Sequence, residues 1–278
     1  ACTARLLDDV TIEAEIDEDP DQRRIAVADF SATVTAIEDL THDVKGLRLT
    51  LDAGAAIDFQ AGQYVNLAIP TVGGTRAFSI ANPPAEGHHV ELQIRRVPGG
   101  AGTGWVHDTL KVGDRVAFSG PYGRFFVRKS RGGPLLFLAG GTGVSSPRSM
   151  VLDLLAEGYG EPMTLIHGVR TQADLYDRDL FEASAAKYSN FRYVPALSAE
   201  PEGSDWVGER GFVHEVAERL FGGSFEGQTA YLCGPPPMIE ASIGALMKGR
   251  LFEKHIFTER FLTASDGAEK KSPVFRRI

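Results

Sequence analysis

The sequence has little cysteine and no hydrophobic run long enough for a membrane span. Its 278 residues include only two cysteines, Cys2 and Cys233, far apart in the chain. This excludes a disulfide-rich scaffold and favours a reducing compartment, so we expect a cytoplasmic protein. The longest apolar run, PLLFLAGG at 134–141, is typical of a buried strand and too short to cross a bilayer. The seven histidines show no metal-ligand spacing.

An excess of positive charge is also missing. The net charge is −8, and residues 1–21 contain eight acidic side chains against one base. Subtracting their −7 from −8 leaves −1 for the rest of the chain. This balance excludes a basic nucleic-acid-binding protein. The acidic run is either a solvated segment or a segment that docks on a partner, and the sequence leaves both readings open.

Two kinds of secondary-structure pattern divide the chain. Residues 30–130 contain six short, partly alternating segments separated by turn residues, with one helical interruption at 104–111. This pattern predicts an antiparallel six-stranded β-barrel. Residues 131–278 alternate apolar strands with amphipathic helices, which predicts an α/β domain with a doubly wound parallel sheet. Residues 1–29 precede both domains.

A glycine-rich turn follows the first predicted strand of the α/β region. That strand leads into Gly141, Thr142 and Gly143, and a helix is expected to begin near Ser145. Glycines let a backbone approach a pyrophosphate closely, and a helix N-terminus offers free N–H groups. The match to G-x-G-x-x-G is incomplete because Ser146 takes the third glycine position. A tight structural turn is therefore an alternative to a dinucleotide site.

A second turn of this kind lies in TAYLCGPPPM, where Cys233, Gly234 and Pro235 join a strand to a helix. The carboxyl ends of parallel strands meet at one edge of the sheet, where such sheets bind ligands. Cys233 is then expected at the binding crevice. A buried, inert cysteine is the alternative.

The third pattern is TRAFSIANPP in the barrel region. Arg76 and Phe78 alternate with Ala77, so both side chains share one face of the predicted strand. A guanidinium beside an aromatic ring can hold a phosphate and stack on a planar ligand. Ser79 offers a hydroxyl near the end of the strand. Taken alone, the motif also fits a surface arginine over a core phenylalanine.

Together, four short motifs resemble the ferredoxin–NADP reductase superfamily, which pairs a flavin-binding barrel with a nicotinamide-binding α/β domain. The resemblance extends from about Phe30 to Leu262, and Phe78 stands where that family more often has tyrosine. Segments such as SGPYGRFFVRKS and FTERFLTASDGAE are similar to reductase components of bacterial multicomponent phenol hydroxylases. The four motifs follow one another in that family's order: RAFS at 76–79, GPYG at 120–123, GGTG at 140–143 and CGPP at 233–236.

On the barrel side, the resemblance implies the contacts of an FAD cofactor. Arg76 would hold the pyrophosphate, Phe78 would stack on the isoalloxazine, and Ser79 would donate a hydrogen bond to flavin N5. Further residues would line the ribityl, adenine and pyrophosphate parts: Ile94, Arg95, Val97, Gly102 and Thr103.

On the α/β side, the resemblance implies the contacts of NADH. The turn of Gly141, Thr142 and Gly143 would cradle its pyrophosphate, with Arg170 as a further candidate. Cys233 and Gly234 of the second turn would flank the nicotinamide, and Pro235 is a further cofactor-binding candidate. Glu259 would end the last strand near the flavin, and Phe261 would cover the ring. The expected catalytic residues are therefore Ser79, Cys233 and Glu259.

The same resemblance implies a [2Fe–2S] ferredoxin domain before the barrel, with cysteines spaced C-x4-C-x2-C and a fourth further on. Cys2 would match the fourth ligand, and residues 1–29 would be the remnant of that domain and its linker. The other three ligands are not in this sequence, so no cluster is expected in this chain.

The expected function is an NADH-oxidising FAD reductase. Its expected partners are the ferredoxin domain of the same protein and the hydroxylase component of a diiron monooxygenase such as phenol hydroxylase. Two alternatives stay open: the reductase of a Rieske-type dioxygenase, and a flavin- or nucleotide-binding module without turnover. The partner oxygenase cannot be read from the fold, because many electron-transfer chains share it.

The residues after the strand FRYVPAL favour NADH over NADPH. Members of the family that use NADPH commonly have a serine followed by a basic residue at this place. Here Ala199 follows Ser198, and Glu200 comes next. A 2′-phosphate would meet a carboxylate, which disfavours NADPH. Arg170 either reaches an adenosine phosphate or is a solvated loop residue.

We predict that Ala199→Arg increases the use of NADPH relative to NADH, because it adds a cation where a 2′-phosphate would lie. The measurement is kcat/KM with each coenzyme for the variant and the parent chain. An unchanged ratio would contradict the assignment of this site.

Overall fold

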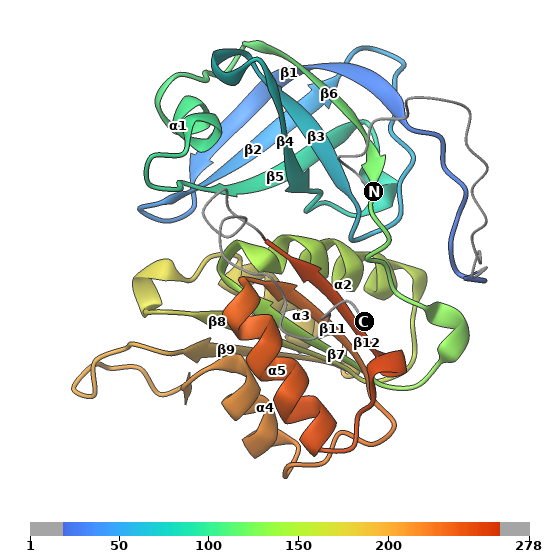
Figure 1. Cartoon of the computed structure of the whole chain (residues 1–278), viewed down its shortest axis with the longest axis vertical. Coiled ribbons are helices and arrows are strands. Elements are labelled where there is room, and N and C mark those ends of the chain that lie inside the picture. The colour runs from blue at the N-terminus through green and yellow to red at the C-terminus, as the bar shows by residue number, and fades with distance from the viewer. Residues whose placement is uncertain (1–18, 262–278) are drawn as a thin grey trace, which may run out of the picture.

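The computed structural model describes residues 19–261, and the two domains lie one above the other (Figure 1). An antiparallel six-stranded barrel is followed by an α/β domain with a parallel sheet, so the predicted fold class is confirmed. Cys2 lies outside the described residues. None of the helices within residues 19–261 has the length and apolar character that a membrane crossing needs.

The barrel strands follow the order β4-β3-β6-β1-β2-β5, and each neighbouring pair is antiparallel. Alternate residues point inward, so that Val65, Leu67 and Ile69 of one strand lie in the barrel core. The outer strands β4 and β5 are joined by a single bridge, between Ile80 and Leu92, and the barrel is open along this side. The strands are β1 (Ala28–Asp39), β2 (Val44–Leu51), β3 (Tyr64–Ile69), β4 (Gly74–Ser79), β5 (His89–Arg95) and β6 (Arg115–Tyr122).

Helix α1 (Ala101–Asp108) covers one end of the barrel and begins three residues before the predicted start at 104. The sequence pattern did not predict the first turn because glycines stand at positions 100, 102 and 104, and glycine is a poor helix former. The Thr103 hydroxyl accepts a hydrogen bond from the Val97 N–H at 3.0 Å and donates to the Gly100 carbonyl at 3.3 Å. These bonds hold the loop that leads into the helix.

The α/β domain contains a six-stranded sheet in the order β10-β9-β8-β7-β11-β12, and every neighbouring pair is parallel. The apolar pattern does not indicate β10, which has only two residues, neither of them apolar. The strands are β7 (Leu135–Gly140), β8 (Met163–Val169), β9 (Phe191–Leu197), β10 (Glu209–Arg210), β11 (Thr229–Gly234) and β12 (Ile256–Arg260).

Helices cover both faces of this sheet, as the doubly wound pattern predicts. Met150 and Phe181 bring α2 (Ser145–Glu157) and α3 (Arg178–Lys187) onto one face. Val216 and Ile239 bring α4 (Val213–Leu220) and α5 (Pro236–Lys248) onto the other. Short 3-10 turns lie between the elements: η1 (Pro70–Val72), η2 (Pro84–Glu86), η3 (Lys129–Arg131), η4 (Gly141–Val144), η5 (Gln172–Asp174) and η6 (Glu253–His255).

The strand order reverses between β7 and β11. From β7 the chain builds outward to β10, and it then returns to place β11 and β12 on the other side of β7. A crevice forms outside the carboxyl ends of strands at such a switch point. Both glycine-bearing turns, after Gly140 and after Gly234, therefore stand at one place in the fold, below the barrel (Figure 1).

The two domains share a hydrophobic core. Phe125 and Val127, which follow the last barrel strand, belong to the same buried cluster as Phe137 of β7 and Met150 of α2. Polar contacts add to this joint, because the Ser149 hydroxyl on α2 donates to the Asn82 carbonyl at 2.7 Å. The predicted division between residues 130 and 131 lies inside η3, at the connection between the domains.

Candidate active site

A buried carboxylate stands where the barrel meets the α/β sheet. Oε2 of Glu259, on β12, accepts a hydrogen bond from the Ser146 hydroxyl at 2.9 Å and one from the Ser79 hydroxyl at 3.4 Å. The Cys233 thiol donates to the same oxygen at 3.8 Å, since Cys233 and Glu259 are paired across β11 and β12. The structure thus brings together the three side chains named as catalytic candidates, and these assignments stay predictions.

Ser146 is the member of this cluster that sequence reasoning missed. It lies in the first turn of α2, fully buried, and it makes the shortest of the three hydrogen bonds to Glu259. The available signal is the serine at the third glycine position of the dinucleotide motif. A serine at this position can donate a hydrogen bond to Glu259, which a glycine could not do, so the departure from the motif adds a donor to the site.

Burial sets the protonation states in this cluster. It raises the pKa of Glu259 to about 6, although the hydrogen bonds from Ser146, Ser79 and Cys233 act in the opposite direction. Burial raises the pKa of the Cys233 thiol well above its usual range, and the nearby Glu259 carboxylate adds to this effect. At neutral pH, Cys233 is therefore a neutral thiol, and Glu259 is mainly a carboxylate that takes up a proton as the pH falls through about 6.

The two glycine-bearing turns at the switch point pack backbone against backbone. A Cβ atom at Gly143 would lie 2.2 Å from the Cys233 carbonyl oxygen, and one at Gly140 would lie 2.5 Å from the Met238 sulfur. Gly141 differs, because its φ of +53° is left-handed and its Cβ position faces open space. Gly143 is therefore required for close packing, whereas Gly141 leaves room for a ligand beside the first turn of α2.

On the barrel side, Arg76 lies across the start of α1. A Cβ atom at Gly102 would be 3.0 Å from Cγ of Arg76, so glycine is what allows the arginine to pass over the helix N-terminus. The Arg76 side chain is exposed, donates to the Thr75 carbonyl at 2.8 Å, and forms no ion pair within residues 19–261. An available guanidinium beside free helix N–H groups fits a pyrophosphate.

Strand β4 presents an open face beside Arg76. Residues 74–77 are exposed, Phe78 is half-buried, and Ser79 is buried at the end that reaches Glu259. Antiparallel sheets commonly leave one face to solvent, but here four consecutive residues are exposed, so both faces of the edge strand are uncovered. A planar ligand lying along β4 would cover it, with its ring at Phe78 and its edge at Ser79, so these residues fit a flavin.

The other predicted flavin contacts have local partners. Ile94 is 1% exposed, its side chain lies in the barrel core, and its carbonyl oxygen is 3.0 Å from Nε2 of His107. Nε of Arg95 is 2.7 Å from Asp43 in an exposed ion pair. The Val97 N–H and the Thr103 hydroxyl bond to each other within the loop before α1. Their contacts to a flavin stay predictions.

On the α/β side, the loops after β8 and β9 are joined by a carboxylate. Glu200 accepts hydrogen bonds from the backbone N–H and the side-chain amide of Gln172, both at 2.9 Å. The Ala199 N–H donates to the Arg170 carbonyl at 2.8 Å. Glu200 is therefore held beside Arg170 and Ala199 at the carboxyl edge of the sheet, where an adenosine ribose could bind.

The residues after Cys233 complete the second turn. Gly234 has a φ of +152° and packs against Gly140, and Pro235 begins α5 as its N-cap. The Phe261 N–H donates to the Gly234 carbonyl at 3.0 Å, and its ring packs against the shared core cluster. Phe261 thus lies next to this turn, and its cover over a flavin ring stays a prediction.

A second polar group also crosses the domain interface. The Ser145 hydroxyl donates to Oε1 of Gln93 on β5 at 2.9 Å, and the Gln93 amide donates to Asp177 at 2.5 Å. Arg148 of α2 bonds to Glu91 at 2.9 Å and approaches Asp177 at 3.2 Å. The sequence offers no signal for this group, because its members come from three separate segments.

For a metal, residues 19–261 hold no group of three or more histidine, cysteine or acidic side chains arranged as ligands. The predicted cluster ligand Cys2 lies outside that range, so its assignment stays a prediction.

We predict that Glu259→Gln raises the free energy of unfolding, with a gain that grows between pH 5 and pH 8. The pKa of Glu259 is about 6 in the folded chain against an ordinary 4.5. Its contribution to stability is therefore complete below about pH 4.5 and is lost as the pH rises through 6. The difference is worth about 2 kcal/mol at neutral pH.

Urea denaturation across this pH range provides the measurement. The exposed Glu226, paired with Arg250 at the surface, is the matched control. Glu226→Gln is expected to give no gain that grows with pH. A pH-independent effect of Glu259→Gln would show that its carboxylate is not strained by burial.

Comparison with known proteins agrees with this geometry. Residues 31–127 match the family of oxidoreductase FAD-binding domains, and residues 137–243 match the family of oxidoreductase NAD-binding domains. The chain is 54% identical to the reductase component of phenol 2-monooxygenase from Pseudomonas sp. strain CF600, over 100% of this chain and 79% of that protein. It is 51% identical, with the same coverage, to the phenol hydroxylase P5 protein of Acinetobacter pittii strain PHEA-2.

A solved structure shares the same fold. The crystal structure of the Amycolatopsis cytochrome P450 reductase GcoB aligns with a TM-score of 0.80 and 36% identity, covering 86% of this chain and 72% of that one. The chain therefore belongs to the ferredoxin–NADP reductase-like family of FAD- and NAD-binding oxidoreductases, among the reductase components of phenol hydroxylases.

Proposed function

We propose that this chain takes hydride from NADH and delivers electrons, through a [2Fe–2S] ferredoxin domain of the same protein, to a diiron hydroxylase that acts on phenol. The observation that carries the redox proposal is the shared carboxylate of Glu259, which links Ser79 of the barrel to Ser146 of the α/β domain. The names of the two phenol-hydroxylase relatives support the choice of hydroxylase. The cytoplasmic location expected from the sequence stays a prediction.

Arg76 and the first turn of α1 would bind the pyrophosphate of FAD, and Phe78 would stack on the flavin ring. When bound there, FAD supplies the ring that accepts hydride. The Ser79 hydroxyl lies at the end of β4 and donates toward Glu259 in the structure. The hydroxyl has a single hydrogen to donate, so its donation to a flavin nitrogen would replace the bond to Glu259.

The turn of Gly141, Thr142 and Gly143, which leads into α2, would bind the NADH pyrophosphate through its backbone N–H groups. The neutral thiol of Cys233 and the adjacent Gly234 would border the nicotinamide without placing a negative charge against it. Because Cys233 and Ser79 contact the same carboxylate from opposite domains, the two rings would meet across Glu259. These residues would align the nicotinamide with the flavin, and such alignment can lower the activation free energy of hydride transfer by several kcal/mol.

Glu259 would also control a proton near the reacting rings. Its carboxylate is buried and has a pKa of about 6, so it can take up a proton at Oε2 near neutral pH and return it. Protonation would also remove an acceptor for the Ser79 hydroxyl. The rate of flavin reduction should therefore change as the pH passes through 6.

Glu200 supports the choice of NADH. It is fixed between the loops after β8 and β9 by two hydrogen bonds from Gln172, and these bonds lower the pKa of its carboxyl. Glu200 is thus an anion near the place of an adenosine ribose. It could accept hydrogen bonds from ribose hydroxyls but would repel a 2′-phosphate.

Anaerobic titration of the FAD-loaded chain with NADH, and separately with NADPH, tests this function. We expect the yellow flavin absorbance to bleach with about one equivalent of NADH and much more slowly with NADPH. A chain that binds no flavin, or whose flavin is unaffected by NADH, would exclude the reductase and favour a binding module.

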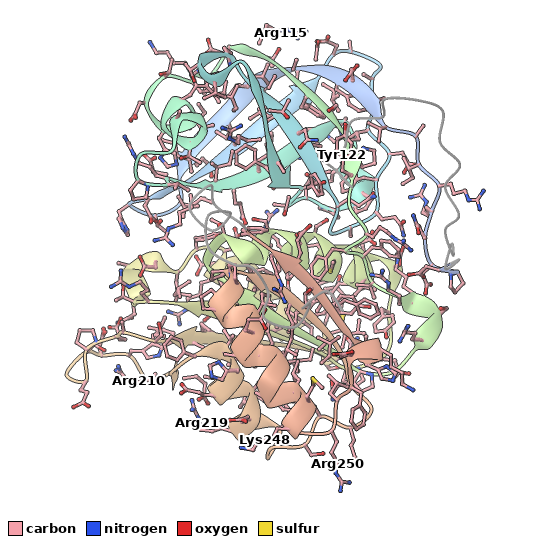
Figure 2. The ribbon with its side chains drawn as sticks, in the orientation of Figure 1. Arg115, Tyr122, Arg210, Arg219, Lys248 and Arg250 are labelled. Atoms are coloured by element: carbon pink, nitrogen blue, oxygen red, sulfur yellow. The ribbon has the colours of Figure 1, made fainter. Side chains whose placement is uncertain are left out.

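We also predict that Arg76→Ala weakens FAD binding by about ten- to a hundredfold, because a charge-assisted hydrogen bond contributes about 1.5–3 kcal/mol. Fluorescence titration of the apoprotein with FAD gives the dissociation constant. Arg115→Ala is the control, since Arg115 pairs with Asp52 at the far end of the barrel (Figure 2). Equal affinities in both variants would contradict the pyrophosphate site.

A further inference from the structure

The last residues of the acidic run dock on the joint between the domains. Oδ2 of Asp19 lies 2.9 Å from Nε of Arg128, and their side chains are only 16% and 8% exposed. Asp21 accepts hydrogen bonds from the N–H and the hydroxyl of Ser130, at 2.9 and 2.6 Å. Asp19 and Asp21 are therefore docked on this chain itself, and docking of the acidic run on a partner stays a prediction. We call the Asp19–Arg128 pair the clasp.

Arg128 is held from several directions. Its guanidinium lies between two rings, 4.0 Å from the centroid of Phe126 and 4.2 Å from that of Phe257 on β12. Its Nη1 donates to the Phe126 carbonyl at 2.6 Å, and its backbone N–H donates to the Tyr231 hydroxyl at 2.8 Å. A buried guanidinium without an anion is strongly unfavourable, so Asp19 is what allows Arg128 to stay between these rings.

The strand pair under Arg128 is the one that carries the active-site carboxylate. Tyr231 of β11 is paired with Phe257 of β12, and two residues further along Cys233 is paired with Glu259. Side chains two apart on a strand share a face, so both pairs point to the same side of the sheet. The Tyr231 and Phe257 rings are stacked, with centroids 5.2 Å apart and planes at 17°. Arg128 of the clasp therefore packs on the Tyr231–Phe257 pair, which lies next to the Cys233–Glu259 pair on the same face of the sheet.

We propose that Arg128, held by Asp19, is a positioning residue that keeps the Cys233–Glu259 pair in place and thereby couples the segment before the barrel to the active site. The part that concerns Glu259 in hydride transfer depends on the function proposed above. Without Asp19, the Arg128 guanidinium moves from between the two rings into water, which exposes the Phe257 ring to solvent. The paired carboxyl ends of β11 and β12 then separate more often.

Such opening has two measurable effects. The first is access of reagents to the fully buried Cys233 thiol. The second concerns Glu259, which is faced by Ser79, Ser146 and Cys233 and lies near Tyr64. None of these groups is a cation, so the pKa of Glu259 depends mainly on burial, and hydration moves it down toward its ordinary value.

The test compares Asp19→Asn with Asp52→Asn in a Cys2→Ser background, where Cys233 is the only thiol. Asp52 is the matched control, since its exposed pair with Arg115 lies on the barrel far from the joint (Figure 2). The FAD-loaded chains are labelled with an aromatic disulfide reagent well below their melting temperatures. We expect Asp19→Asn to label at least about tenfold faster than the parent, since tenfold corresponds to 1.4 kcal/mol in the opening equilibrium. Asp52→Asn should match the parent.

The pH profile of flavin reduction by NADH is the second readout. In Asp19→Asn, the change expected near pH 6 should move to lower pH, whereas a role confined to overall stability would lower Tm and leave the profile in place.

Arg128→Lys keeps the charge and should label more slowly than Arg128→Met. An unchanged labelling rate or an unchanged pH profile in Asp19→Asn would overturn the inference. If NADH does not reduce the parent chain, the proposed function fails, while labelling still decides whether the clasp protects Cys233.

Discussion

The buried carboxylate of Glu259 is the constraint on which the arrangement of the two domains depends. A carboxylate removed from water is stable only when hydrogen bonds replace its hydration. Those bonds come from Ser146 and Cys233 in one domain and from Ser79 in the other, so the full set forms only when barrel and sheet are in register. The raised pKa shows that the replacement is incomplete. The same incompleteness makes Glu259 able to exchange a proton near neutral pH.

Close packing of the two turns at the switch point sets the position of the hydrogen-bond donor Ser146 relative to the Glu259 carboxylate. Gly143 brings the turn before α2 against the backbone of Cys233, where any side chain would collide. This contact brings Ser146, in the first turn of the helix, within reach of Glu259. The glycine motif thus has two separate physical roles in this chain. Gly141 leaves space for a phosphate, and Gly143 sets the distance between two loops.

The joint between the domains contains a shared hydrophobic core and a buried cation. A common core crosses it, and Arg128 lies there between Phe126 of the barrel side and Phe257 of the sheet. Asp19 supplies the anion that this buried cation needs. The segment that arrives before the barrel is therefore part of the structure that supports the reductase site.

Local patterns in the sequence were enough to predict both domains. Alternation in segments such as YVNLAI and the strand–helix rhythm after residue 131 depend on neighbours in the chain, and so do the turn at Gly141 and the Arg76–Ser79 motif. The sequence by itself therefore determined the fold class and the residues proposed for FAD and NADH. Tertiary structure alone decided that Ser146 joins Glu259, that Gln93 bridges the domains, and that Asp19 meets Arg128 across 109 positions of sequence. These contacts form between separate segments, and their free energies depend on burial, which no local pattern records.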